Sequence, residues 1–88
     1  MRKYMIVYDL EKRGEDYEPL LDALRKIGAL HPLYSKWVIR TNYTAVQLRD
    51  YLKQFIDAGD LLLVVGLTGE AAWTKLFITD QQFKEAIA

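Results

Sequence analysis

Asp9 is the residue of this sequence whose position best suits metal chemistry. It follows an apolar run rich in β-branched and aromatic residues, KYMIVYDL at residues 3–10, which predicts a buried strand. A carboxylate at the carboxyl end of such a strand is a candidate ligand for a hard cation such as Mg²⁺. The alternative is an aspartate that closes a turn by accepting hydrogen bonds from nearby backbone N–H groups. The sequence alone leaves both roles open.

Basic residues form a second candidate site, for phosphates. They are Lys12 and Arg13 in the turn after the first strand, and Lys36 and Arg40 on one side of a later strand. Tyr34 and Trp37 are interleaved with the second pair and could stack on bases. The alternative is that these aromatic rings pack in the core or in an interface while the charges only solubilise the chain. The formal net charge is +0, which argues against a strong, non-specific grip on nucleic acid.

Most other catalytic templates are excluded by composition. The chain has no cysteine and 1 histidine, so it contains neither a thiolate site nor a His-rich metal site of its own. No HExxH or GxxxxGK[ST] motif occurs. His31 precedes a proline and has no paired nucleophile nearby in sequence, so we expect a structural role for it.

The length of 88 residues predicts a single domain, residues 1–88, and 51% hydrophobic residues indicate a globular chain. The longest apolar stretch, residues 61–67, is too short to span a membrane, and the charged N-terminus does not resemble a signal peptide. We therefore expect a cytoplasmic protein with no membrane partner.

The hydrophobic periodicity predicts a split βαββαβ order. Strands are expected at residues 3–10 and 60–68, and a hairpin at 29–41. One helix should carry Leu20 and Leu24 and end at Gly28, with Asp16 as its cap and Pro19 in its first turn. The second should start at Thr44 in a capping box, carry Leu52 and end at Gly59.

This order predicts an α+β, ferredoxin-like sandwich: an antiparallel sheet with two helices on one face. An extension at residues 70–88 follows. Within it we expect a short strand at 73–78 and a terminal helix that Thr79 caps. The extension could also contact a partner protomer.

Two strands of the predicted sheet, at residues 3–10 and 60–68, are apolar on both sides. Tyr4, Ile6 and Tyr8 alternate with Met5 and Val7, and the strand at 60–68 alternates in the same way. Two helices cover only one face of such a sheet. We therefore predict a homodimer that packs sheet to sheet, with cover by the chain's own terminal segment as the alternative.

The segments KYMIVYDL, YSKWVIRT and DAGDLLLVVGLTG, together with the order of elements, resemble the small CRISPR-associated spacer-acquisition subunit. They are also similar to its stand-alone SinR-like relatives and, more distantly, to virulence-associated protein D. The resemblance implies a ferredoxin-like homodimer in which a C-terminal strand can reach the partner. It also implies an Mg²⁺-dependent nuclease with Asp9 as metal ligand, Ser35 after the hairpin turn, and Trp37 at the aromatic position.

Two functions follow as expectations. The first is a metal-dependent endonuclease acting on RNA or DNA, in which two Asp9 carboxylates meet across the dimer axis and bind Mg²⁺. The second is a non-catalytic dimeric module that binds nucleic acid or protein. The residues expected to contact nucleic acid are Lys12, Arg13, Ser35, Lys36 and Arg40.

Overall fold

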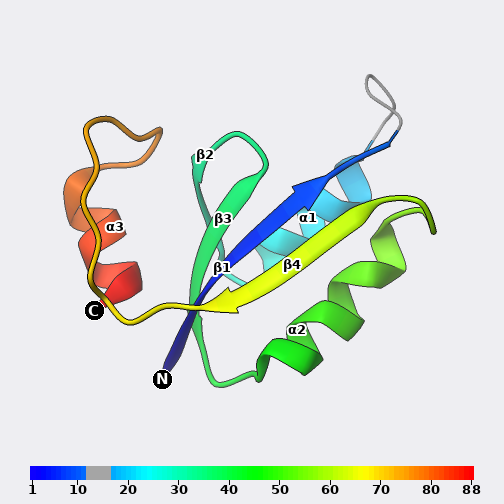
Figure 1. Cartoon of the computed structure of the whole chain (residues 1–88), viewed down its shortest axis with the longest axis horizontal. Helices are drawn as coiled ribbons and strands as arrows, with labels where there is room; N and C mark the ends of the chain where they lie inside the picture. Colours follow the sequence, from blue (N-terminus) through cyan, green and yellow to red (C-terminus); the bar gives the residue numbers. More distant parts are fainter. Residues whose placement is uncertain (12–16) are drawn as a thin grey trace.

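The computed structural model describes residues 1–11 and 17–88 of the chain (Figure 1). The strands are β1 (Arg2–Asp9), β2 (Leu30–Leu33), β3 (Lys36–Thr41) and β4 (Leu61–Gly66). The helices are α1 (Glu18–Lys26), α2 (Ala45–Leu52) and α3 (Asp80–Ile87), and a 3₁₀ turn, η1 (Lys53–Phe55), follows α2. None of the helices in these described ranges is long and apolar enough to cross a bilayer.

The four strands form one antiparallel sheet in the order β2-β3-β1-β4. β1 lies in the middle, with Tyr4 opposite Ile39 of β3 on one side and opposite Gly66 of β4 on the other. The predicted α+β class and antiparallel sheet are confirmed, and this strand order is compatible with a ferredoxin-like fold.

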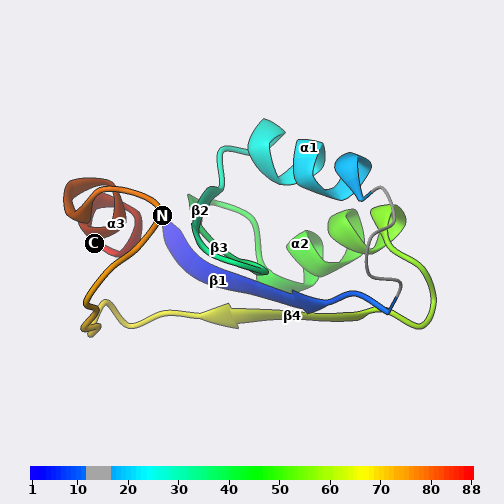
Figure 2. The same ribbon diagram turned by 90° about the horizontal axis from the view of Figure 1, so that it is seen from above.

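One face of the sheet is covered by α1 and α2, which lie side by side over it (Figure 2). Ile6 of β1, Leu24 of α1 and Leu52 of α2 are fully buried in this layer. Burial of each such side chain contributes about 1.5–3 kcal/mol relative to exposure. The predicted helix faces are therefore confirmed as core.

The opposite face of the sheet has a second, smaller core under α3. Val38 of β3 is fully buried there against Phe83 and Ile87 of α3, and Met5 of β1 packs at its edge. The C-terminal segment thus folds back onto its own sheet. It covers the part of the face that lies over β3.

The helix boundaries follow the local sequence. Gly28 has φ 86°, a left-handed conformation that favours glycine and ends α1 as predicted. Thr44 and Thr79 each form a complete capping box, with Gln47 and Gln82 respectively. Pro19 lies in the first turn of α1, while the cap predicted at Asp16 falls outside the described residues.

The prediction of a short strand at residues 73–78 is wrong, because the structure has no strand in this stretch. Its backbone meets β2 through the N–H of Phe77, which donates to the carbonyl oxygen of Pro32 at 2.9 Å. Pro32 has no N–H with which to return a ladder bond. A proline in the edge strand β2 therefore prevents the sheet from extending in this direction.

Leu24→Ala and Leu52→Ala should each lower the free energy of unfolding by about 2–5 kcal/mol, because each leaves a cavity in the core between the sheet and the helices. Urea denaturation measures this change. Val46→Ala is the matched control, since Val46 lies on α2 and is 56% exposed; it should change stability by less than about 0.5 kcal/mol. Losses below about 1 kcal/mol at both core positions would contradict this description of the core.

Candidate functional site

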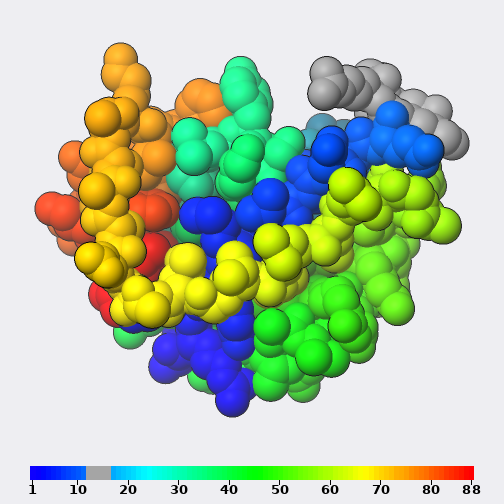
Figure 3. Space-filling model, viewed as in Figure 1, coloured from blue at the N-terminus to red at the C-terminus, as the bar shows by residue number. Residues whose placement is uncertain are grey.

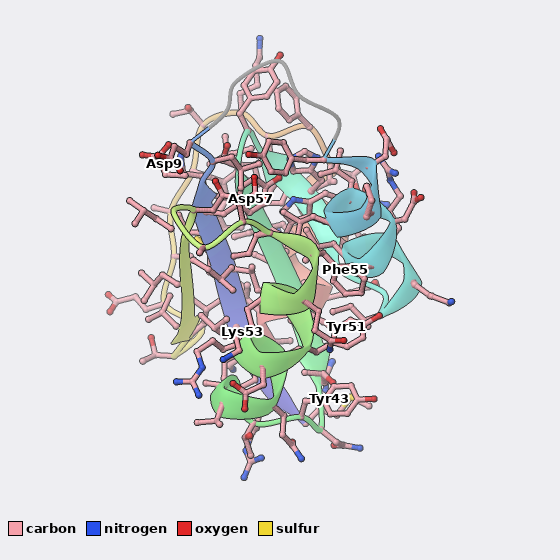
Figure 4. All side chains as sticks on the ribbon, turned by 90° about the vertical axis from the view of Figure 1, so that its right-hand side faces the viewer. Asp9, Tyr43, Tyr51, Lys53, Phe55 and Asp57 are labelled. Atoms are coloured by element: carbon pink, nitrogen blue, oxygen red, sulfur yellow. The ribbon has the colours of Figure 1, made fainter. Side chains whose placement is uncertain are left out.

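Asp9 is the last residue of β1 and is exposed. It stands opposite Leu61 of β4 and shares the alternation of Met5 and Val7, whose side of the sheet faces away from α1 and α2. Figure 4 shows Asp9 at the same end of the molecule as Asp57, in the turn before β4. Asp9 therefore lies at the rim of the sheet face that the first two helices leave free.

Three exposed apolar side chains extend from Asp9 along this face. Leu61, Leu63 and Val65, here called the β4 patch, are 62%, 57% and 41% exposed. They stand opposite Asp9, Val7 and Met5 of β1. In Figure 3 the atoms of β4, coloured yellow-green to yellow, form a band across the visible face of the molecule. A contiguous apolar surface of this kind is typical of an interaction site.

A metal ion at Asp9 would need ligands from outside this strand end. Within residues 1–11 and 17–88, no group of three or more His, Cys, Asp or Glu side chains is placed to hold a metal ion. One carboxylate suits Mg²⁺ only when substrate phosphates or a second carboxylate complete the coordination. Asp9 can serve as one such ligand, and its exposure leaves room for the others.

The predicted phosphate contacts are separated in space. Lys36 stands opposite Val7 on the same face as the β4 patch. Arg40 lies two positions further along that face, beyond Val38, and its Nη1 donates to the carbonyl oxygen of Glu85 in α3 at 3.4 Å. The structure therefore brings Lys36 close to the patch and Arg40 close to α3. Lys12 and Arg13 lie outside the described residues.

Ser35 and Trp37 both shape the end of the β2–β3 hairpin. Ser35 occupies the turn with φ 59°, and its carbonyl oxygen accepts a hydrogen bond from the N–H of Tyr8 at 3.2 Å. Trp37 is only 2% exposed, and its Nε1 donates to the hydroxyl of Tyr8 at 3.0 Å. Of the two roles that the sequence left open for Trp37, the structure supports core packing.

Asp60 is a key polar residue that the sequence analysis did not single out. Its Oδ1 accepts from the N–H of Glu11 at 2.7 Å and from the hydroxyl of Tyr17 at 3.3 Å, and its Oδ2 accepts from the N–H of Asp57 at 2.8 Å. These bonds join the segment after Asp9 to the turn before β4. The aspartate after glycine in DAGD is typical of a residue that bonds nearby backbone N–H groups, and this pattern could have identified it.

A hollow between α1 and α2 is a further feature without a counterpart in the sequence analysis. Its volume is about 450 Å³, and its lining includes Ile27, Tyr43, Leu48 and Tyr51. Figure 4 shows Tyr43 and Tyr51 along α2, away from Asp9. The hollow is thus separate from the β4 patch. The four-residue spacing of positions 43, 47 and 51, all in its lining, could have predicted one shared helix face.

No known family model matches this chain, and no solved structure matches it significantly. The resemblance to the CRISPR-associated spacer-acquisition subunit stays a prediction from sequence segments. The functional argument therefore starts from the geometry of Asp9 and the β4 patch.

Asp60→Ala should make the backbone amides of Glu11 and Asp57 exchange with deuterium faster, because both lose their acceptor. We expect the free energy of unfolding to fall by about 1–3 kcal/mol. Asp50→Ala is the control: Asp50 is exposed and pairs with Arg49 in a surface ion pair of α2, so its loss should cost less than about 1 kcal/mol. Unchanged exchange at both amides in Asp60→Ala would contradict the role of this carboxylate.

Proposed function

We propose that this protein is a ferredoxin-like homodimer that cleaves RNA or DNA with the help of a divalent cation held by the Asp9 residues of the two copies. One observation carries the proposal: Asp9 lies at the rim of the exposed β4 patch. A second copy that buries this patch therefore brings a second Asp9 into the same interface. The sequence resemblance to the spacer-acquisition subunit family supports the same fold and activity.

A second copy of the chain is a suitable partner for the β4 patch. A two-fold interface is self-complementary, so an apolar patch that needs cover supplies the same apolar cover to its partner. Lys36 and Asp9 flank the patch with opposite charges. A two-fold interface over the patch then contains as many ammonium groups as carboxylates, so it does not accumulate net charge.

The direction of the two-fold axis decides whether the two carboxylates can share a cation. If the axis runs along the strands, both Asp9 residues lie at the same end of the interface. If the axis runs perpendicular to the strands and passes Val7, each Asp9 lies two residues from the axis, on opposite sides of it. The two Cα atoms are then separated by four residues of strand, or about 13 Å. The nuclease activity requires the first arrangement.

The chemistry assigned to this pair is hydrolysis of a phosphodiester. The two Asp9 carboxylates would hold a divalent cation, which when bound would neutralise charge on the phosphate and lower the pKa of a water. In the hydrolysis a water oxygen would bond to phosphorus while the bond from phosphorus to the leaving oxygen breaks, and the leaving oxygen would take a proton from solvent. Lys36, on the same sheet face, is positioned to contact a neighbouring phosphate. Arg40, Ser35 and the Lys12–Arg13 segment are proposed as further contacts.

A non-catalytic dimeric module that binds nucleic acid or protein is the second candidate. It is favoured by the absence of a three-residue acidic or histidine group within residues 1–11 and 17–88. In this case the dimer holds its partner through Lys36 and the adjacent surface, and Asp9 acts as a turn residue at the end of β1.

Leu63→Glu should convert the dimer to a monomer, because the interface would bury two unpaired carboxylates. Light scattering after size exclusion at micromolar concentration measures the mass. Val46→Glu is the matched control, since Val46 is similarly exposed, at 56%, but lies on α2. It should remain dimeric. A monomeric wild type, or a dimeric Leu63→Glu, would overturn the proposed interface.

Asp9→Ala should abolish cleavage of a single-stranded RNA or DNA oligonucleotide in the presence of Mg²⁺ while the variant remains a folded dimer. The reason is that the cation loses the carboxylate ligands that this proposal assigns to it. Asp50→Ala, an exposed acid on α2, should retain full activity. Cleavage without a divalent cation, or full activity in Asp9→Ala, would contradict the assignment of Asp9. A wild type that binds the oligonucleotide but does not cleave it in the presence of any divalent cation would support the second candidate.

A further inference from the structure

His31 is a residue of the edge strand β2, and its side chain packs against the core residue Trp37. Its imidazole stacks on the indole of Trp37, with ring centroids 4.1 Å apart and planes at 5°. The hydrogen bond from Trp37 to the Tyr8 hydroxyl, on the same face of the sheet, fixes the indole. Phe77 approaches the imidazole edge-on, with centroids 6.4 Å apart. His31 therefore links β2, β3 and the segment that precedes α3.

The Nε2 atom of His31 is buried and has no hydrogen-bond partner among the described residues. Burial lowers the pKa of His31 below its ordinary value, the nearby guanidinium of Arg25 lowers it further, and a hydrogen bond with the Leu33 backbone acts in the opposite direction. In the neutral ring an unpaired nitrogen lone pair has a modest cost. Protonation would place a charged N–H in the same position without an acceptor, which costs considerably more.

Residues 67–79, here called the C-terminal strap, are attached to β2 beside this histidine. The N–H of Phe77 donates to the carbonyl oxygen of Pro32, the residue that follows His31, at 2.9 Å. The Phe77 ring also packs edge-on against Tyr34 with centroids 4.9 Å apart. The strap continues into α3, whose Phe83 and Ile87 cover Val38. A movement of the His31 ring would therefore affect the strap and, through it, the cover that α3 gives to Val38.

We propose that His31 is an acid-sensitive latch for the C-terminal strap. In its neutral form the imidazole stays stacked on Trp37 and supports Phe77 against β2. When it is protonated, Nε2 must reach water, so the ring leaves the stack and Phe77 loses its contact. The strap then detaches from β2, and the cover that α3 gives to Val38 and Met5 weakens. The latch is independent of the proposed nuclease activity, because it involves neither Asp9 nor the β4 patch.

The direction of the pH dependence follows from the two states of the strap. In the open state His31 faces water and has an ordinary pKa of about 6.5. In the closed state its pKa is lower. The closed state is therefore fully stable above about pH 6.5, and its stability falls as the pH drops from there towards the closed-state pKa. Each unit of difference between the two pKa values corresponds to a tenfold change in the opening equilibrium.

Burial and charge at His31 favour this direction, and the Leu33 backbone acts against it. Among the described residues, Arg25 of α1 is the charged group that acts on the ring, and it is positive. Trp37 of β3 and Phe77 of the strap are uncharged, and Tyr8 of β1 and Tyr34 of the hairpin contribute phenols. No carboxylate in the described part of the chain is among the causes that act on the imidazole. A proton on His31 is therefore without a counter-ion in the closed state.

Amide hydrogen exchange on the full chain at pH 7.5 and pH 5.0, corrected for intrinsic rates, tests the latch. In the wild type, the protection of the Phe77 amide should fall at pH 5.0 by up to about tenfold for each unit of pKa difference, while the Leu24 amide of α1 keeps its protection. In His31→Phe, which can stack but cannot be protonated, Phe77 should keep the same protection at both pH values. Equal protection at both pH values in the wild type, or an equal fall in His31→Phe, overturns the latch.

An NMR titration of the wild type provides a second test that does not depend on the variant folding. The chain has 1 histidine, so its ring protons are assigned without ambiguity. The imidazole should titrate below pH 6.5, and the loss of Phe77 protection should follow the same curve. A His31 pKa at or above 6.5, or a strap opening that does not track it, contradicts the proposal.

Discussion

The structure depends on a sheet whose central strand is apolar on both sides. Tyr4, Ile6 and Tyr8 of β1 face α1 and α2, while Met5 and Val7 face the other way. Two helices in a βαββαβ chain fall on one face, because each crossover returns over the same side of the sheet. The second face must therefore find cover of its own. Where it stays uncovered, an apolar surface of this kind is typical of an interaction site.

The C-terminal segment covers one part of this second face. α3 packs over Val38, and the strap that leads to it is attached to β2 by Phe77. The cover stops before β4, so Leu61 and Leu63 stay exposed next to Asp9. The candidate site thus lies where the C-terminal segment leaves the sheet face uncovered. The register of β1 against β4 positions Asp9 at the rim of this exposed apolar surface.

Polar contacts fix the positions of segments that apolar packing alone does not determine. Asp60 connects the segment after Asp9 to the turn before β4, so the end of β1 is held where a second chain could meet it. At the other side, the hydrogen bond of Trp37 to Tyr8 positions the indole on which His31 stacks. Both sets of contacts join segments that are far apart in sequence. Neither follows from local pattern alone.

The sequence by itself determined the strands and helices that the structure contains, because helix periodicity, strand alternation and caps are local. It also predicted a strand at residues 73–78 that does not form. The Thr44 capping box, the Gly28 stop and the two-sided apolar strands are all read from neighbours within a few residues. Tertiary structure decided which of those apolar faces is covered, since the path of residues 67–88 depends on contacts with β2 and β3. It also decided that Pro32 blocks a further strand, that Trp37 is core, and that Lys36 and Arg40 have different neighbours. Asp9 was identifiable from its place at the end of a strand, but its relation to an exposed patch was not, because exposure is a property of the whole packed chain.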